Sequence, residues 1–404
     1  MTDNRFRRLP VGIQSFKVIR EENYLYVDKS DIVWNMVNLG DKYNYLSRPR
    51  RFGKSVLVDT LESYLEGRKD LFEGLKIMQL EKDWKQYPVI RLDMSRGGAN
   101  EETLRSYLNL RFKDYEEKYN ITPDPTAMLA DRFHAIIATA YKQTGLRVAV
   151  LIDEYDSPLQ HSWRTPEHEK CTGVYREVFA ILKADDEYEH FIFITGITKF
   201  TQISLFSVLN NLSNISFMPE YATICGITEE EIKKNFMPEL KQMSEVNNWS
   251  VQETHNRLKA YYDGYHFSRR NMVDVYNPYS LVNALKSKEI INFWASSGAT
   301  SLLPKFVDNA ELRMKNFEHC RIMRNTLELS DVSGGGAELF LYQSGYLTIK
   351  DSDEFGYILG FPNEEVKQAL YEMALPALTL RTVTFISAVG RPYSDCLLFL
   401  RVLP

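Results

Sequence analysis

The sequence of 404 residues is poor in cysteine and lacks long apolar runs. Its four cysteines are scattered and form neither a CxxC pair nor a Cys/His cluster, so we predict no zinc site and no disulfide framework. This usage is typical of a reducing compartment. The chain starts with MTDNRFRRLP, which is charged where a signal peptide is apolar, and no stretch reaches the length of a membrane span. We therefore expect a cytoplasmic protein without a membrane partner.

An excess of positive charge is also missing, since the formal net charge is −5. That value argues against a protein that binds nucleic acid over a general basic surface. One local cationic group remains in Arg48, Arg50, Arg51 and Lys54, so we expect any anion to be bound locally. Hydrophobic residues make up 44% and charged residues 25% of the chain, a balance that predicts a folded protein with more than one packed unit.

Up to about residue 225, short apolar runs alternate with longer amphipathic stretches. The apolar runs are YNYLS (43–47), PVIRLDMS (88–95), RVAVLIDE (147–154), HFIFITGIT (190–198) and YATICGI (221–227). The stretches between them, such as VLVDTLESYL and EETLRSYLNLRFKDYEEKY, have the length and spacing of helices. Strands separated by such helices predict an α/β fold class with a mostly parallel sheet that helices flank on both sides.

After this region the pattern becomes helical, beginning with ITEEEIKKNF. Thr228 is a suitable N-cap and Glu231 completes a capping box. We expect a helical lid over residues 226–298 and a small α+β, winged-helix-like unit over 299–375, in which the acidic turn DSDE joins a hairpin. Residues 376–404 form an apolar tail with few charges, which is atypical of a soluble surface.

The segment SRPRRFGKSVLVDTL, which starts at Ser47, is similar to the phosphate-binding loop GxxxxGK[ST]. The half of that motif that contacts phosphate is intact, but Arg48 stands at the first glycine and Pro49 follows it. The loop lies between a predicted strand and a predicted helix, as the motif requires. We predict an ATP-binding loop made of Arg50, Arg51, Phe52, Gly53, Lys54, Ser55 and Val56. The alternative is a chance GKS tripeptide in a basic turn.

A pair of carboxylates follows the apolar run RVAVLIDE and supports the nucleotide interpretation. Asp153 and Glu154 end that predicted strand, at the edge of a parallel sheet where a phosphate loop also lies. We expect Asp153 to hold Mg²⁺ together with the Ser55 hydroxyl, and Glu154 to polarise the attacking water. The alternative is that both carboxylates belong to a solvated turn.

The next apolar run, HFIFITGIT, ends in threonines. A hydroxyl at the tip of the neighbouring strand can hold the water or the γ-phosphate, and Thr195 is the preferred candidate over Thr198. Threonine also favours strands for purely structural reasons, so that interpretation stays open. Asp156 is either a support of the metal site or a turn former before Ser-Pro. The aromatic segment YDGYHF is expected to pack the lid against the sheet.

Several blocks, in order, resemble the predicted AAA-ATPase-like family of the Bacteroides type. They include LPVGIQSFKVIREENYLYVDKS, SRPRRFGKS, VLIDEYDSP, ITGITKFTQISLFSVLNNL, YNPYSLV and YQSGYLTIK, and they extend from about Leu9 to about Leu375. The resemblance implies that the arginine at the first loop position is the family's own version. It implies phosphate and Mg²⁺ roles for Lys54 and Ser55, metal and water roles for Asp153 and Glu154, and contact of Ile13 and Phe16 with the base.

Members of this family commonly carry a C-terminal nuclease-like domain, for which this chain has no room after the last block. We expect a truncated or frame-shifted relative without nuclease activity. The leading hypothesis is Mg²⁺-dependent ATP hydrolysis that acts as a conformational switch. The alternatives are a phosphotransferase, or a non-catalytic scaffold that binds nucleic acid through Arg48, Arg50 and Arg51. A nucleic acid or protein partner is expected at the C-terminal unit, and the oligomeric state stays open.

Overall fold

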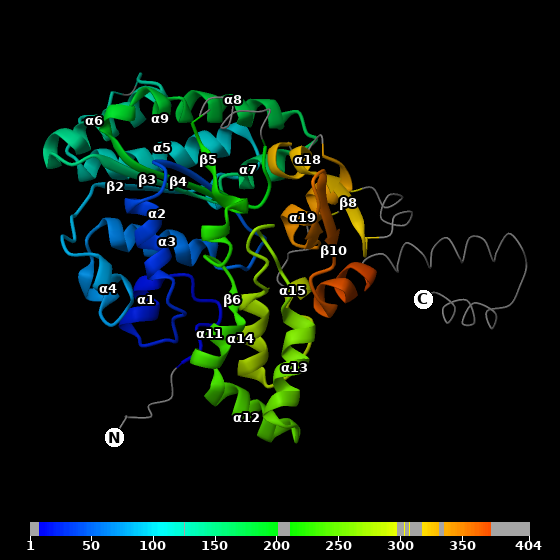
Figure 1. Ribbon diagram of the computed structural model, residues 1–404. Coiled ribbons are helices and arrows are strands. Elements are labelled where there is room, and N and C mark those ends of the chain that lie inside the picture. Colours follow the sequence, from blue (N-terminus) through cyan, green and yellow to red (C-terminus); the bar gives the residue numbers. More distant parts are fainter. Residues whose placement is uncertain are drawn as a thin grey trace, which may run out of the picture.

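A five-stranded sheet forms the centre of the protein (Figure 1). Its order is β2 (Val89–Asp93), β3 (Val148–Asp153), β4 (Glu189–Gly196), β1 (Tyr43–Ser47) and β5 (Ser213–Asn214). Every pairing in this sheet is parallel, which confirms the predicted α/β class. The computed structural model describes residues 8–124, 126–200, 211–296, 303, 307, 317–330 and 335–372. Strands β3 and β4 are buried almost throughout, because helices cover both faces of the sheet.

Two layers of helices enclose the sheet (Figure 1). One layer contains α1 (Phe16–Glu21), α2 (Ser30–Asn38), α3 (Lys54–Leu65) and α4 (Ile77–Leu80). The other contains α5 (Glu101–Lys118), α6 (Leu129–Thr144), α8 (Glu167–Phe179) and α9 (Ile181–Ala184), and α7 (Ser157–Ser162) packs against α8. Helix α3 follows β1 directly and contacts β3, so the start of α3 lies at the carboxyl end of the sheet.

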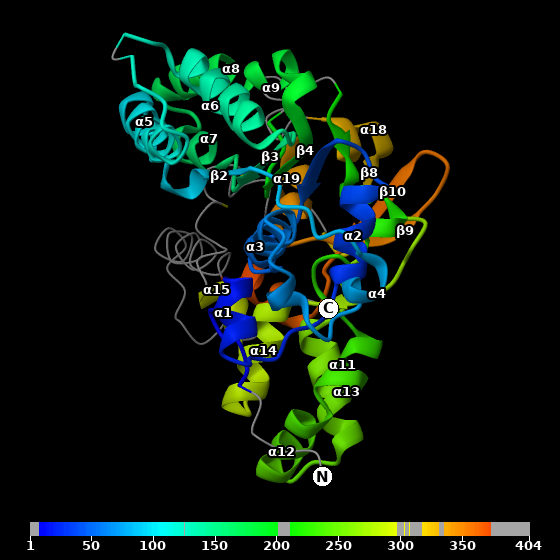
Figure 2. The ribbon, with the colours of Figure 1, turned by 90° about the vertical axis from the view of Figure 1, so that its left-hand side faces the viewer.

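A helical bundle below these layers corresponds to the predicted lid (Figure 2). It contains α11 (Glu229–Asn235), α12 (Met237–Asn247), α13 (Val251–Tyr262), α14 (Pro278–Ser287) and α15 (Phe293–Ser296), with the strand pair β6 (Ile227–Thr228) and β7 (Val275–Tyr276). Thr228 caps α11 and Glu231 closes the capping box, as predicted. The bundle has a hydrophobic core of its own, to which Leu25 also belongs.

The C-terminal unit combines two helices with a second, antiparallel sheet of order β8-β10-β9. Its elements are β8 (Cys320–Met323), α18 (Arg324–Leu329), α19 (Gly336–Ser344), β9 (Thr348–Ser352) and β10 (Gly356–Gly360). The predicted hairpin around DSDE is confirmed by the β9–β10 pair. Core residues of this unit and of the central sheet form one hydrophobic cluster. The tail over 376–404 lies outside the described residues, and the division of the chain at 225, 298 and 375 stays a prediction.

The strand predicted over YATICGI is wrong for most of its length. Only Ile227 of that run is in a strand, β6, which pairs with β7 in the lid and not with the central sheet. Ser213 and Asn214 provide the fifth strand instead. Ile224 and Cys225 are buried in turns. A short apolar run is therefore found in a buried loop as well as in a buried strand, and the sequence pattern does not separate the two. Among the described helices, none is both long and apolar enough to cross a membrane.

Candidate nucleotide-binding site

The loop between β1 and α3 turns sharply at two residues. Arg51 and Gly53 adopt left-handed backbone conformations, with φ angles of +68° and +88°. Glycine takes this conformation without steric cost, whereas arginine rarely does. The turn places the start of α3, at Lys54, against a cavity, and the first amide groups of a helix have no partners within the helix. Such amides bind anions, so the local geometry suits phosphate.

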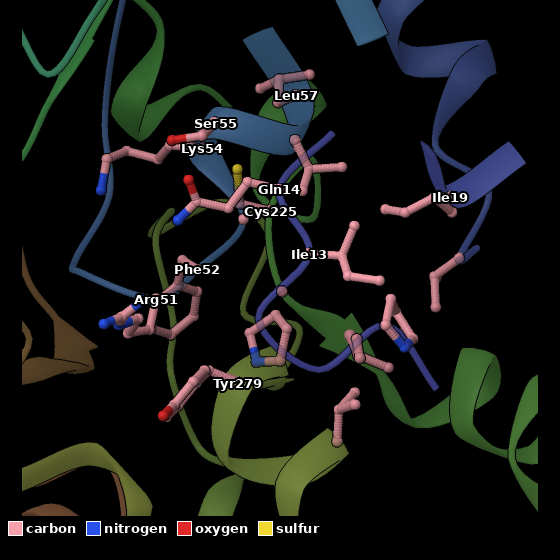
Figure 3. A pocket seen from close by; sticks show the side chains of 18 of the residues that line it. Ile13, Gln14, Ile19, Arg51, Phe52, Lys54, Ser55, Leu57, Cys225 and Tyr279 are labelled. Atoms are coloured by element: carbon pink, nitrogen blue, oxygen red, sulfur yellow. The ribbon is translucent and has the colours of Figure 1, made fainter. Parts of the chain in front are cut away.

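The cavity at this loop has a volume of about 400 Å³ and lies between three segments (Figure 3). Residues 50–57 form the wall on the side of the loop, and residues 10–14 approach from the N-terminal segment. The start of α14 contributes Pro278 and Tyr279 from the lid. Cavities of this size and mixed character are typical of sites for small organic ligands. All seven residues predicted for the loop, Arg50 to Val56, line this cavity.

Lys54 is buried and turns back on its own loop. Its Nζ donates hydrogen bonds to the carbonyl oxygens of Arg48 and Pro49, both at 3.0 Å. Burial lowers the pKa of Lys54, while the nearby carboxylates of Glu154 and Asp153 oppose that shift. The charges of the acidic pair therefore act on the ammonium of Lys54. Carbonyl and phosphate oxygens are both acceptors, so the same group can exchange one for the other.

Ser55 and Asp153 both line a small cavity at the carboxyl end of β3. Burial raises the pKa of Asp153, and the hydrogen bond from the Ser55 hydroxyl partly offsets the increase. A hydroxyl and a carboxylate are oxygen donors of the kind that Mg²⁺ prefers, and this ion usually completes its shell with phosphate and water. In the described part of the chain, no group of three or more His, Cys, Asp or Glu side chains is placed to hold a metal. The residues present thus fit a magnesium ion that accompanies a phosphate ligand.

Glu154 follows directly and has an unusual backbone. Its φ angle is +46°, a left-handed conformation that costs a non-glycine residue about 1–3 kcal/mol. The amide of Glu154 donates to Oδ1 of Asp153 at 2.9 Å. Burial raises the pKa of the Glu154 carboxyl, and Lys54 opposes this increase. A carboxylate with a raised pKa is a better general base at neutral pH.

A second, polar cavity of about 200 Å³ adjoins the first. It shares Gln14, Ser55 and Glu154 with the larger cavity, and its remaining wall is formed by Ser15, Asp59, Arg91, Asp93, Ser95 and Asp153. Asp153 was predicted from the sequence, but Ser15, Asp59, Arg91, Asp93 and Ser95 were not. One signal was present, because Asp93 ends the run PVIRLDMS just as Asp153 ends its own, and the two residues are paired in the sheet. The other members come from separate elements that no local pattern connects.

Thr195, predicted to hold the water, does not reach either cavity. It is fully buried, and its hydroxyl donates to the carbonyl oxygen of Leu46 on β1 at 2.8 Å. Its catalytic role stays a prediction that this geometry does not support. Asp156 is a structural residue instead of a turn former at the surface. Its buried carboxylate accepts from the amides of Ile197 and Thr198, at 3.0 and 2.6 Å, and so holds the segment that follows β4.

Arg48 points into the protein and away from both cavities. It is 1% exposed. Its guanidinium donates to the carbonyl oxygens of Ser216 and Tyr221, both at 2.9 Å, and lies 4.1 Å from the centre of the Phe267 ring. The residue that replaces the first glycine therefore connects the loop to the segment after β5 and to the lid. The alternative in which Arg48 contacts nucleic acid is wrong, because its side chain is not accessible.

Phe52 continues this connection. Its ring packs edge-on against Tyr265 and Phe267, with centroids 4.7 and 5.4 Å away. These two rings belong to the segment YDGYHF, so its predicted packing role is correct. Arg51 lies with its guanidinium 4.9 Å from the ring centre of Tyr279 on α14 (Figure 3). The phosphate loop thus contacts the lid at more than one point.

The two residues expected near the base have different positions. Ile13 lines the larger cavity (Figure 3). Phe16 does not, since its ring is buried between Tyr26 and Phe72, with centroid distances of 5.0 and 4.9 Å. The expectation for Phe16 is therefore corrected, because this residue anchors the segment from the core side. Ile13 stays a candidate for contact with a base.

The loop between β1 and α3 and the acidic end of β3 lie at the same edge of a parallel sheet. This arrangement, with the GKS sequence in the loop, defines a P-loop NTPase fold. The family model described as "Predicted AAA-ATPase" matches residues 10–206. An uncharacterized protein in the vnfD 5' region of Azotobacter chroococcum mcd 1 is 32% identical over 378 residues, covering 91% of this chain and 70% of that protein. The chain belongs to the predicted AAA-ATPase family.

One solved structure also shows a likeness, the Aeropyrum pernix ORC1 protein in complex with DNA. It has a TM-score of 0.30 and 12% identity, and the match covers 84% of this chain and 89% of that chain. A likeness at this score supports no conclusion about the fold or the ligand of the present protein.

Proposed function

We propose that this protein binds ATP in the larger cavity, hydrolyses it with Mg²⁺ and changes its conformation with the state of the nucleotide. One observation carries the proposal. Lys54, Ser55 and Glu154 line the cavity of about 400 Å³, and Asp153 lines the smaller polar cavity that shares Ser55 and Glu154 with it. Membership of the predicted AAA-ATPase family supports the same ligand.

Each of these residues has a distinct task. The amides at the start of α3 and the ammonium of Lys54 bind the phosphate oxygens. Ser55 and Asp153 hold the magnesium ion, which when bound neutralises phosphate charge. Glu154 accepts a proton from water as the water oxygen bonds to the γ-phosphorus. The bond from that phosphorus to the bridging oxygen breaks, and the electron pair leaves with ADP.

The switch is supported by how tightly the loop packs on the rest of the chain. Phe52 contacts Tyr265, whose hydroxyl donates to the carbonyl oxygen of Gly345 at 3.1 Å. Pro49 approaches the same glycine so closely that a Cβ there would lie 2.6 Å from the Pro49 Cβ. A movement of the loop therefore displaces the lid and the C-terminal unit together. Phosphate contacts that reorder a segment are a common origin of such changes.

A second link between sheet and lid runs along the floor of the cavity. Lys29 lines the cavity, and its Nζ lies 2.6 Å from Oε1 of Glu231 on α11. Both side chains are largely buried, at 10% and 19% exposed. A buried ion pair of this kind favours one relative position of the two parts, because separating the charges leaves each without a partner.

The experiment that tests the proposal is a titration of the purified full chain with ATP, with and without Mg²⁺. Binding is followed by calorimetry and hydrolysis by phosphate release. We expect ATP to bind in the presence of Mg²⁺ and phosphate to appear only then. Adenosine serves as the matched control, and it should bind far more weakly because it lacks phosphates. If ATP does not bind better than adenosine, the phosphate site is wrong.

A further inference from the structure

Gln14 occupies the boundary between the two cavities. Of the residues that the structure describes, only Gln14, Ser55 and Glu154 line both of them. In Figure 3 the carboxamide of Gln14 points toward the part of the cavity where the Ser55 hydroxyl lies. The loop motif does not include this glutamine, which is exposed and makes no side-chain hydrogen bond to the residues that the structure describes.

The backbone next to Gln14 is fixed to the helix that carries Ser55. Oδ2 of Asp59 accepts from the Ser15 hydroxyl at 3.1 Å and from the amide of Phe16 at 2.5 Å. Asp59 comes four residues after Ser55, so both side chains lie on the same face of α3. The other oxygen of Asp59 accepts from Arg91 at 2.7 Å, which orients the carboxylate. The position of Gln14 relative to the phosphate loop is therefore set in advance.

The chemistry at this boundary needs both a donor and an acceptor. The terminal phosphate presents acceptor oxygens, and the attacking water presents a proton that an acceptor can orient. A carboxamide supplies two N–H donors and a carbonyl oxygen on one planar group. It is also neutral, so it adds no negative charge to a cavity wall that already holds the carboxylates of Asp59, Asp93, Asp153 and Glu154, where a further carboxylate would repel the phosphate.

We propose that the Gln14 carboxamide donates a hydrogen bond to the terminal phosphate of bound ATP and accepts one from the attacking water. This inference rests on the proposed function. Gln14 then distinguishes ATP from ADP and aligns the water with the γ-phosphorus, while Glu154 takes the proton. Its contribution falls on the chemical step and on the terminal phosphate, and not on the base or the two inner phosphates.

The test compares Gln14→Ala and Gln14→Glu with Gln79→Ala, which removes an exposed glutamine on α4 outside both cavities. Phosphate release gives kcat and KM, and calorimetry gives the affinities for ADP and for a non-hydrolysable ATP analogue. In Gln14→Ala we expect kcat to fall by about 100-fold, as for the loss of one transition-state hydrogen bond. Affinity for ADP should be unchanged. Gln14→Glu, which has the same size, should weaken the analogue more than Gln14→Ala does.

The outcomes separate this inference from the proposed function. A wild-type chain that binds no nucleotide overturns the proposed function. If the wild type hydrolyses ATP and Gln14→Ala matches it in kcat and in both affinities, only the role of Gln14 is overturned. An equal loss of ADP and analogue binding also overturns it, since the residue would then act on the base or the inner phosphates. If the wild type binds nucleotide without hydrolysing it, the ratio of the affinities for the analogue and for ADP is compared between wild type and Gln14→Ala. An unchanged ratio then overturns the role of Gln14, and a lower ratio for the analogue supports it. Thermal melts of all variants exclude unfolding.

Discussion

The two halves of the phosphate loop face opposite environments. Arg48 and Pro49, in the first half, are buried against the segment after β5, the lid and the C-terminal unit. Gly53, Lys54 and Ser55, in the second half, line the cavity. One short loop therefore packs into the protein with its first half and faces the cavity with its second half.

This difference explains the altered motif. In a loop that uses glycine at the first position, the backbone turns freely and the side chain contributes nothing. Here the guanidinium of Arg48 satisfies the buried carbonyls of Ser216 and Tyr221 and packs on Phe267. The arginine is thus a structural element, and it leaves the residues of the second half facing the cavity. Substitutions in the two halves should therefore have separable effects.

Glu154→Gln changes the carboxylate that faces the second half. We expect kcat for phosphate release to fall by about 1,000-fold, because the amide cannot accept the proton from water. ATP affinity should be retained, since the amide keeps the size and removes a negative charge near the phosphates. Glu169→Gln is the control, because the side chain of Glu169 is 76% exposed on α8. Unchanged turnover in Glu154→Gln would show that another group is the base.

Arg48→Ala probes the first half. We expect the free energy of unfolding to drop by about 3 kcal/mol, because the change leaves buried carbonyls without donors and opens a cavity. Urea denaturation of the nucleotide-free chain measures the drop. Arg51→Ala, three residues along the same loop, should cost less than about 1 kcal/mol, as its guanidinium lies on an aromatic ring at the surface. Similar losses in both variants would contradict the division of the loop.

Lys54→Ala probes the second half. ATP affinity should fall by about 30-fold, which corresponds to about 2 kcal/mol for the loss of a charged hydrogen bond to phosphate. Stability should change less than in Arg48→Ala, because the lysine is a buried cation whose pKa is already lowered by burial. Calorimetric titration gives the affinity and urea denaturation the stability. Lys17→Ala, whose side chain is 54% exposed, is the control. If Lys54→Ala lost much stability but still bound ATP as the wild type does, Lys54 would be a structural residue and not a phosphate-binding one.

Asp263→Asn tests the lid segment against which the first half packs. Burial raises the pKa of Asp263 to about 7, and the charges around it are Lys259, Lys350, Asp274 and Glu229. The folded pKa exceeds the unfolded one, so the wild type loses stability as the pH rises from about 4 to about 7. Asparagine does not ionise. The stability of the variant relative to wild type should therefore increase by about 2 kcal/mol between pH 5 and pH 8 in urea denaturation.

Asp274→Asn tests a carboxyl group whose pKa is shifted in the opposite direction to that of Asp263. The hydrogen bond from His266 holds the pKa of Asp274 below its ordinary value, so its charged form stabilises the folded state. We expect Asp274→Asn to be less stable than wild type at both pH values. If the free energy of unfolding changed equally with pH in Asp263→Asn and in wild type, water would have to reach the Asp263 carboxylate.

Local patterns were sufficient to predict much of this protein. The alternation of apolar runs and helical stretches predicted the parallel sheet, and the capping box at Thr228 predicted the start of α11. The tripeptide beginning at Gly53 and the pair Asp153 and Glu154 predicted both sides of the site, because parallel strands bring their carboxyl ends to one edge. In each case the physical signal lies within a few consecutive residues.

Other features depend on contacts between distant segments and left no local signal. From the sequence alone, Arg48 is expected to be an exposed cation. The structure buries it against Ser216 and Phe267, which are distant in the chain. The hydroxyl of Thr195 turns to Leu46 because β1, and not solvent, is its neighbour. Gln14 lies at the boundary of the two cavities because its neighbours Ser15 and Phe16 donate hydrogen bonds to Asp59, more than 40 residues later on α3. A side chain's direction and its partners follow from packing, which a pattern of neighbouring residues does not contain.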